Sequence, residues 1–586
     1  MCSEEIILEI EDTPIVCKKE ELIAHSDYFK AMLEGNFIES SKRVIRLEGV
    51  DLRAMNIILT LLWDESYLIQ NEDILIVLQA ACMLQFVNIR NICLEQIIEM
   101  LSPKNCIKIW HVTEQLNIKP LFLNAKAMAL EEFLEIKDTD CILELSLEEI
   151  YYYLGHIHLK TDNELSVFQT AMKWWYENNS QCVENPMKNL LKLLSCVDYQ
   201  SLLDNYLRET MTYPDIASNL EVTQILSCIL QIKNGHSVAD FSEVCQERAR
   251  LLYNSKSRMS PVLPCILVNF IQLEGKNKKA KVSKEQDYVV YYDHNLREFK
   301  RLFDIDGQKC HGLDGFKLVG YKEFAFMYGG EFLIGKGNWN YNFWVFDTIR
   351  ERWERKCVLP FPRRHFETCM VGTNLYIIGG TGVFRVIQEN MFWYNYKEDK
   401  WSTQIMLPFP GRQLKCCNFL NQLFILNISN KCGFFFNEKT FVWKKMEIAI
   451  DDGVINNLSD FSIFSYKNSL YIKGKSLIEF VVMEKEIVLI SIKDVTNIVC
   501  DKMELVLCNN IVYTFYKYRY EDNDTYSLEI YNLETGDIDF VFKDAPSDTV
   551  IDIDGNQFIV SSSLKIFAFQ HHNLVEDNIL VNNCFE

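Results

Sequence analysis

The sequence predicts three consecutive domains: an α+β domain over residues 1–102, an all-α domain over residues 103–255, and an all-β propeller over residues 256–586. Three observations support this order. Two strand-like segments open the chain, and apolar residues at spacings of three and four then continue to about residue 255. Beyond residue 260 this period disappears. Short runs rich in Val, Ile, Phe and Tyr then alternate with turns, which is typical of β-sheets.

The first domain begins with a predicted β-hairpin. Residues 5–10 (EIILEI) and 13–17 (TPIVC) have the pattern of short strands, and Glu11-Asp12 joins them in a turn. Apolar residues at helical spacing follow over residues 73–84, and the same spacing recurs in the second domain over residues 165–177. A small sheet followed by many helices predicts an α+β domain and then an all-helical one.

A repeated hairpin predicts the architecture of the third domain. Three tryptophans each follow an aromatic residue by seven positions, and an Asp or Asn comes directly after that aromatic residue. The pairs are Phe346 with Trp353, Tyr394 with Trp401, and Phe436 with Trp443. We expect a strand, a turn and a strand in each case, with the Asp or Asn side-chain oxygen accepting hydrogen bonds at the start of the turn.

The same seven-residue offset predicts further hairpins of the same kind. It joins Tyr292 to Phe299, Phe480 to Ile487, and Tyr531 to Ile538. A period of about 40–50 residues with short strands is typical of a β-propeller. Six blades are predicted, and residues 552–569 add strands that either close the ring or form a seventh blade.

Two adjacent glycines mark one predicted blade. Gly379-Gly380 follow an apolar strand in the run LYIIGG, where a larger side chain would clash near the crowded centre of a propeller. The sequence indicates this double glycine in a single blade. The preceding blade is expected to carry Gly335 and Gly337 in its place.

The repeat around Trp401 resembles a Kelch repeat, because residues 363–372 (RRHFETCMVG) and LYIIGG precede Tyr394 and Trp401. Residues 15–47 resemble a BTB domain, in which Ser26, Tyr28 and Phe29 take their expected places. Residues 105–136, and then residues 162–168 together with Trp174, resemble the segment after a BTB domain and a BACK domain. In this order the three resemblances cover nearly the whole chain and identify it as similar to the BTB-BACK-Kelch family.

The resemblance implies a non-catalytic adaptor that binds cullin-3 through its BTB and BACK domains and a protein substrate through its propeller. One family motif carries over, an apolar residue followed two positions later by Glu, here Phe37 and Glu39. An aromatic anchor can fill an apolar groove while a carboxylate fixes the register. The alternative is a chance match, because apolar-x-Glu is common in a chain that is 48% hydrophobic.

The resemblance also implies a BTB homodimer. Glu5 and Lys19 align with a charged pair near the dimer interface of the family. Family members usually carry a helix before the first strand, and this sequence starts directly at that strand. Trp63, Asp64 and Glu65 stand where the family tends to have Tyr-Thr-Gly.

The substrate surface is predicted from loops of the propeller. Arg363, Arg364 and Arg412 follow matching Pro-Phe-Pro turns, and Trp339 and Tyr341 lie in a longer loop. Arginine and aromatic side chains often anchor protein interfaces. The alternative is that these arginines brace adjacent blades.

Composition limits the classes of function. With 60 Lys+Arg against 81 Asp+Glu the net charge is −21, which disfavours nucleic-acid binding. The basic run at residues 276–284 fits a solvated loop better than an import signal or a phosphate contact. No segment approaches the about 20 consecutive apolar residues that a membrane helix needs, and the N-terminus does not resemble a secretion signal. We therefore expect a cytoplasmic protein, with the nucleus as the alternative.

No cofactor, metal or catalytic residue is predicted. The 20 cysteines have irregular spacing without a Cys-x-x-Cys pair, which fits reduced, buried thiols better than redox sensors. No nucleophile elbow, phosphate loop or zinc-protease motif occurs. Two alternatives to the cullin-3 adaptor stay open, namely a scaffold or actin-binding protein that never engages cullin, and a propeller enzyme.

Overall fold

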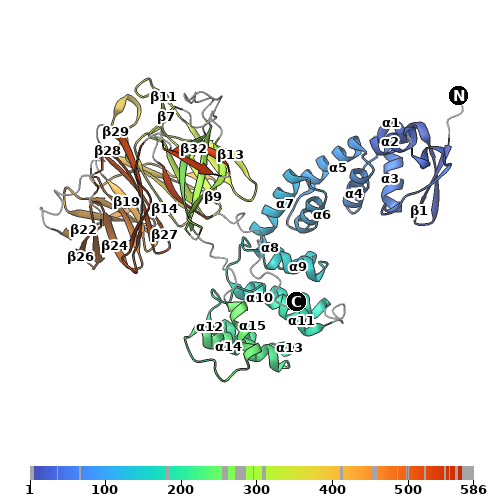
Figure 1. Ribbon diagram of the computed structural model, residues 1–586, viewed down its shortest axis with the longest axis horizontal. Coiled ribbons are helices and arrows are strands. Elements are labelled where there is room, and N and C mark those ends of the chain that lie inside the picture. Colours follow the sequence, from blue (N-terminus) through green and yellow to red (C-terminus); the bar gives the residue numbers. More distant parts are fainter. Residues whose placement is uncertain are drawn as a thin grey trace. The chain divides into compact units, whose positions relative to one another are not determined.

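The computed structural model describes residues 5–35, 37–64, 67–178, 185–253, 262–270, 286–294, 296–305, 312–409, 414–450, 460–484, 486–495, 498, 500–520, 523–546, 549–553, 555–560 and 565–570 (Figure 1). These residues fall into two compact units. One contains the described residues up to 253 and the other those from 262 onward. The first unit is mainly helical, and the second consists almost entirely of strands.

A three-stranded sheet opens the first unit. Strand β1 (Glu5–Ile10) pairs antiparallel with β2 (Thr13–Lys18) and parallel with β3 (Val44–Arg46). Glu11 and Asp12, at φ 48° and 60°, form the tight turn between β1 and β2. Such left-handed two-residue turns match the natural twist of a hairpin. The predicted hairpin is therefore present.

Helices cover one face of this sheet, because alternate residues of β1 are buried. The helices are α1 (Lys19–His25), α2 (Asp27–Glu34), the 3₁₀ helix η1 (Ile38–Ser41), α3 (Leu52–Trp63), α4 (Ile74–Met83) and α5 (Val87–Met100). Asp51 caps α3 by accepting a hydrogen bond from the N–H of Ala54 at 2.8 Å. This cap satisfies a backbone donor that the helix itself leaves free.

Helices continue through the rest of the first unit, as the periodicity predicts. They are α6 (Cys106–Gln115), α7 (Lys119–Glu131), α8 (Phe133–Ile136), η2 (Asp140–Ile142), α9 (Leu147–Leu154), α10 (Glu164–Asn178), α11 (Pro186–Leu194), α12 (Asp204–Thr210), α13 (Pro214–Ala217), α14 (Leu220–Lys233) and α15 (Glu243–Tyr253). Buried polar bonds join them. The indole N–H of Trp174 donates to the carbonyl of Leu145 at 2.9 Å, and the Tyr153 hydroxyl donates to the carbonyl of Ala129 at 2.9 Å.

The second unit consists of antiparallel sheets that follow one another along the chain. One sheet contains β8 (Lys317–Tyr321), β9 (Phe324–Tyr328), β12 (Asn342–Asp347) and β13 (Arg352–Val358). The next contains β14 (Glu367–Val371), β15 (Asn374–Ile378), β16 (Asn390–Asn395), β17 (Lys400–Trp401) and β18 (Ile405–Met406). A small sheet of loop segments comprises β7 (Leu313–Asp314), β10 (Glu331–Phe332) and β11 (Asn338–Trp339).

An eight-stranded sheet follows, in which two antiparallel groups of four join by parallel pairing of β22 with β26. Its strands are β19 (Lys415–Phe419), β20 (Gln422–Asn427), β21 (Cys432–Asn437), β22 (Val442–Ala449), β23 (Ser462–Tyr466), β24 (Ser469–Lys473), β25 (Ser476–Val482) and β26 (Glu486–Asp494). The next four-stranded sheet contains β27 (Lys502–Cys508), β28 (Ile511–Tyr520), β29 (Asn523–Asn532) and β30 (Ile538–Pro546).

The last strands complete a sheet that begins at residue 262. It contains β4 (Val262–Phe270), β5 (Asp287–Asp293), β6 (Glu298–Ile305), β31 (Val550–Ile553), β32 (Asn556–Val560) and β33 (Ile566–Gln570). Ile566 pairs with Ile266, and Phe558 pairs with Phe270. The blade-like sheets fit the predicted propeller, and this pairing joins its two ends. The number of blades stays a prediction.

The predicted hairpin register is confirmed at all three tryptophans. Phe346 lies opposite Trp353, Tyr394 opposite Trp401, and Phe436 opposite Trp443. The turn chemistry also holds, because the carboxylate of Asp347 accepts hydrogen bonds from the N–H groups of Ile349 and Arg350 at 2.9 and 3.1 Å. The Asn395 and Asn437 side chains accept equivalent bonds in their own turns.

One predicted register is wrong. Phe480 lies opposite Leu489, whereas Ile487 pairs with Val482. Val482 and Ile487 form the last pair of this hairpin, so its turn comes later along the chain than the seven-residue offset from Phe480 implies. Phe480 is followed by Val481, whereas an Asp or Asn opens the turn in the three tryptophan hairpins.

The prediction of a single double glycine is also wrong. Gly329 and Gly330 follow β9, at φ 73° and 91°, just as Gly379 and Gly380 follow β15 at 61° and 86°. A Cβ on Gly329 would collide with the ring of Phe366, and a Cβ on Gly380 would lie 2.7 Å from the Cβ of Phe366. Both glycine pairs therefore make room for one buried aromatic residue.

Candidate functional site

The predicted cullin-binding residues follow helix α2, which is firmly attached to the core. The Ser26 hydroxyl accepts a hydrogen bond from the N–H of Phe29 at 3.0 Å and donates one to the carbonyl of Leu84 at 2.6 Å. Phe29 is completely buried. The helix ends at Glu34, and any Cβ on the next residue, Gly35, would collide with the carbonyl of Ala31. Gly35 therefore lets the chain leave the helix close to its last turn.

This turn presents an apolar and acidic surface. Phe37 and Ile38 are 59% and 74% exposed. The Ser40 hydroxyl donates to the carbonyl of Phe37 at 2.7 Å, and Glu39 lies 3.3 Å from the ammonium of Lys42. Its own backbone N–H and then Lys42 lower the pKa of Glu39, so the carboxylate is charged at neutral pH. An exposed aromatic side chain beside a carboxylate is suited to a groove on another protein.

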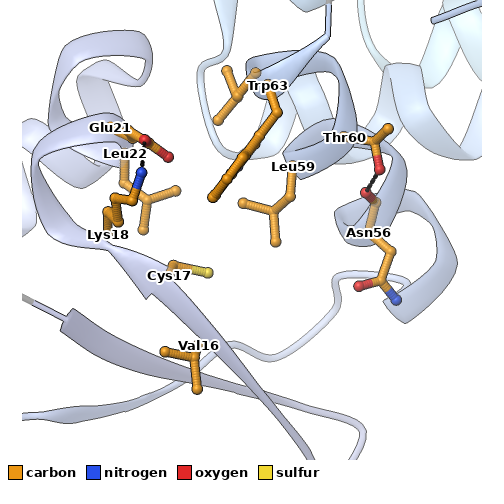
Figure 2. Close-up of a pocket in the computed structure, with 10 residues that line it drawn as sticks. Val16, Cys17, Lys18, Glu21, Leu22, Asn56, Leu59, Thr60 and Trp63 are labelled. Carbon is orange, nitrogen blue, oxygen red and sulfur yellow. Dashed lines mark hydrogen bonds and ion pairs between the residues drawn. The ribbon is translucent and has the colours of Figure 1, made fainter.

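A cleft of about 410 Å³ lies elsewhere in the same domain, between β2, α1 and α3 (Figure 2). Val16 and Trp63, on two of its walls, are 62% and 69% exposed. The Lys18 ammonium lies 4.4 Å from the centre of the Trp63 ring and 2.7 Å from the carboxylate of Glu21. Cys17 faces the same cleft, and burial raises the pKa of its thiol to about 11. The cleft can accept an apolar side chain with a charged neighbour.

This cleft could not be predicted from the sequence, because its walls come from segments about 40 residues apart. The residue that could have pointed to the cleft is Trp63, which stands where the family tends to have Tyr. Glu5, one of the predicted dimer residues, lies opposite Lys18 in the β1–β2 pairing, and the other, Lys19, begins α1. Both predicted dimer residues are thus neighbours of Lys18, which lines the cleft: Glu5 by strand pairing and Lys19 in the sequence. The proposed Glu5–Lys19 contact and the homodimer stay predictions.

In the propeller, the structure places Arg363 inside the protein. Its side chain is completely buried and donates hydrogen bonds to the carbonyls of Gly379 at 2.9 Å and Asn390 at 2.8 Å. The guanidinium also lies 4.6 Å from the centre of the Phe392 ring. Burial lowers the pKa of Arg363 to about 10, which leaves it charged at neutral pH. These contacts fit the bracing role that the sequence left open.

Arg364 is 8% exposed and pairs with Glu331 at 3.3 Å. Glu331 also accepts hydrogen bonds from the N–H groups of Gly335 and Gly337 at 3.0 and 2.9 Å. Burial alone would raise the pKa of Glu331, but these N–H groups and Arg364 lower it overall. Arg364 therefore holds the loop that carries the predicted aromatic residues.

The remaining predicted substrate residues have different positions. Trp339 is partly exposed and pairs with Glu331 in the small sheet, and Tyr341 is 44% exposed. Arg412 and the basic run at residues 276–284 lie outside the described residues. Among the predicted substrate residues that the structure describes, Tyr341 thus offers the most accessible side chain.

Comparison with known families assigns the chain. Residues 3–101 match the BTB/POZ domain, residues 106–212 match the BTB And C-terminal Kelch (BACK) domain, and residues 362–404 match the Kelch motif. The chain belongs to the BTB-BACK-Kelch family. The matched Kelch segment contains the repeat with Gly379-Gly380 and Trp401, and the order of the three matches agrees with the order predicted from the sequence.

Curated relatives of this BTB-BACK-Kelch protein carry Kelch names. Kelch-like protein 38 of Danio rerio is 32% identical over 170 residues, 29% of each chain. Kelch-like protein 24 of Homo sapiens is 26% identical over 215 residues, which cover 37% of this chain and 35% of the relative. Kelch repeat and BTB domain-containing protein 12 of Homo sapiens is 20% identical over 418 residues, 64% of this chain and 66% of the relative. The match to the first two thus spans about a third of their length.

The described residues of this BTB-BACK-Kelch protein contain no helix that is both long and apolar enough to cross a membrane. Within the same ranges, no three His, Cys, Asp or Glu side chains come together in a way that could hold a metal ion.

Proposed function

We propose that this BTB-BACK-Kelch protein is a substrate-recognition adaptor of a cullin-3 RING ubiquitin ligase. Its BTB and BACK domains bind cullin-3, and its propeller binds the protein to be ubiquitinated. The adaptor itself performs no chemistry; it brings the substrate to the ligase, and we place this activity in the cytoplasm.

The exposed turn after α2 carries the proposal. Phe37 and Ile38 expose more than half of their surface although they are large and apolar, and Glu39 supplies a charged carboxylate beside them. Large apolar side chains on the surface of a soluble protein mark interaction sites when they cluster. The turn lies within the segment that matches the BTB/POZ domain, which supports cullin-3 as the partner.

Binding of the cullin-3 N-terminal domain tests the proposal. The full-length protein is immobilised, and its affinity is measured by biolayer interferometry beside the variant Phe37→Ala/Glu39→Lys. We expect the wild-type protein to bind and the variant to bind at least about thirtyfold more weakly, because truncating an interface anchor commonly costs 2 kcal/mol or more.

A matched control is Val244→Ala/Glu247→Lys, which removes an exposed apolar side chain and reverses an exposed charge on α15. This control should bind as the wild-type protein does. No binding by the folded wild-type protein would refute the adaptor function. The alternative of a scaffold or actin-binding protein would then be tested by co-sedimentation with filamentous actin.

A further inference from the structure

Two neighbouring loops of the propeller expose large apolar side chains. The first loop, residues 329–341, carries Leu333 and Ile334, which are 70% and 56% exposed. The second, residues 379–390, carries Phe384 and Val386, which are 93% and 56% exposed. Each loop follows the second strand of its sheet, at the double glycines described above. None of these four side chains was singled out from the sequence.

The two loops are in contact. The guanidinium of Arg385 lies against Gly335, where an added Cβ would be 2.5 Å from the Nη2 atom. Arg364 links both loops, because its side chain pairs with Glu331 and its N–H donates to the carbonyl of Thr381 at 3.0 Å. The exposed apolar residues therefore lie on two loops that contact each other, and we name them together the 333/384 surface (Leu333, Ile334, Phe384, Arg385 and Val386).

The backbone of this surface is strained where its side chains are most exposed. Leu333, Phe384 and Arg385 have φ angles of 55°, 58° and 60°. This left-handed region is unfavourable for residues other than glycine and asparagine, and it persists where the surrounding structure imposes it. Asn or Gly at position 384 would relieve the strain. A phenylalanine that is 93% exposed gains nothing from burial in return.

The charged residues of the two loops and those next to them include one more cation than carboxylate. Arg363 and Arg364 lie beneath it, Arg385 is exposed on it, and Glu331 is the carboxylate among them. The Arg363 guanidinium bonds to carbonyl and amide oxygens, which carry no net charge. When Lys336, Asp314 and Glu389 at the edges are included, four cations face three carboxylates, on a chain whose net charge is −21. This local sign favours an anionic group on whatever binds.

We propose that the 333/384 surface binds a segment of the substrate protein in which apolar side chains flank a carboxylate. The apolar side chains pack on Phe384, Leu333 and Ile334, and the carboxylate pairs with Arg385. This inference rests on the proposed adaptor function and names the chemistry of the segment that the propeller recognises.

Selection from a random 12-residue peptide library displayed on phage tests the proposal, with the full-length protein as the target. We expect the enriched peptides to combine at least two large apolar residues with a neighbouring Asp or Glu. A fluorescein-labelled synthetic copy should bind at least about tenfold more weakly to Phe384→Gly and to Arg385→Ala, because both remove an interface anchor. Phe384→Gly should keep or raise the melting temperature, since it relieves the left-handed strain.

Leu420→Ser is the matched control. Leu420 is 63% exposed at φ 47° in the turn between β19 and β20, far along the chain from either loop. It should leave peptide binding unchanged. The proposal is overturned if no peptide is enriched, if the enriched peptides lack carboxylates, or if they bind Phe384→Gly as tightly as wild type. The proposal is also overturned if the wild-type protein self-associates in sedimentation experiments and Phe384→Gly abolishes this association. The 333/384 surface would then bind a second copy of this chain and not a substrate segment.

The proposed adaptor function and the proposed 333/384 surface can be refuted independently. Cullin-3 binding depends on the turn at Phe37 and is unaffected by Phe384→Gly, whereas peptide binding is unaffected by Phe37→Ala/Glu39→Lys. Loss of peptide selection with intact cullin-3 binding refutes only the 333/384 surface.

Discussion

The ammonium of Lys473 lies 3.0 Å from the carboxylate of Glu529, and neither side chain is exposed to solvent. The Tyr516 hydroxyl completes the group: it accepts a hydrogen bond from Lys473 at 2.9 Å and donates one to Glu529 at 3.3 Å. Lys473 belongs to β24, whereas Tyr516 and Glu529 belong to β28 and β29 of the next sheet. Two successive sheets of the propeller are therefore joined by a buried charge pair.

Removing one member of this pair should strongly destabilise the propeller. Lys473→Met leaves the Glu529 carboxylate buried without its counter-ion, which typically costs about 3–5 kcal/mol. The double variant Lys473→Met/Glu529→Leu should recover most of the loss, because two well-packed apolar side chains often replace a buried pair without cost. Thermal unfolding followed by circular dichroism measures both effects.

An exposed pair supplies the control for this prediction. Lys467 and Glu534 lie 3.2 Å apart, but their side chains are 69% and 52% exposed. Water and salt weaken such a pair, so Lys467→Met should leave the melting temperature nearly unchanged. If the double variant at Lys473 and Glu529 is as unstable as the single one, the loss comes from packing and the charge argument fails.

Lys565 should make the stability depend on pH. Burial lowers the pKa of Lys565 to about 8, although the carboxylate of Glu504 lies 3.5 Å away and opposes this shift. In the unfolded chain the pKa of a lysine is about 10.4. Between these values the unfolded state binds more protons than the native state, so the free energy of unfolding rises with pH from about 8 to about 10.

The comparison with Lys565→Met isolates this contribution, since both proteins share every other titrating group. Unfolding in urea at pH 7 and pH 9.5 should show wild type gaining stability relative to the variant as the pH rises. A wild-type protein that loses stability relative to Lys565→Met over this range would contradict the lowered pKa.

Local chemistry made much of the fold predictable. Phe346 and Trp353 lie in one hairpin, and Asp347 bonds to the turn within three residues of itself, so residues 346–353 contain the whole unit. The same rule misplaced Phe480, because Val481 follows it in place of the Asp or Asn that opens the other turns, and the turn comes later along the chain. Gly329-Gly330 is hard to recognise from the sequence, because Gly335 and Gly337 follow it within the same loop and have the spacing of a degenerate glycine pair.

The candidate sites were less predictable, because they depend on contacts between distant segments. The exposure of Phe37 follows from a short turn and was expected. The cleft beside Trp63 combines β2 with α3, and the 333/384 surface combines loops about 50 residues apart. The buried position of Arg363 depends on the carbonyls of Gly379 and Asn390, which no local pattern reveals.

The cleft beside Trp63 should take part in self-association. Val16 and Trp63 expose apolar surface next to the charged Lys18–Glu21 pair, and the predicted dimer residues lie nearby. Val16→Asp and Trp63→Asp place a carboxylate on this surface, which should weaken a dimer at least about tenfold.

Sedimentation equilibrium of the full-length protein measures the effect of these substitutions on self-association. The control Leu203→Asp changes an exposed leucine elsewhere in the unit, and a wild-type protein that is monomeric at every concentration would refute the prediction.

Gly380 should tolerate a methyl group far less well than Gly337 does. Both have left-handed backbones, at φ 86° and 77°, so alanine at either position carries a strain of about 1–2 kcal/mol. Around Gly337 nothing lies within 4 Å of an added Cβ, whereas at Gly380 it would lie 2.7 Å from the Cβ of Phe366 and 2.9 Å from the carbonyl of Arg364. Phe366 is 1% exposed and cannot move without disturbing the core. Gly380→Ala should therefore lower the melting temperature by several degrees more than Gly337→Ala, and equal losses would show that the crowding beside Phe366 relaxes freely.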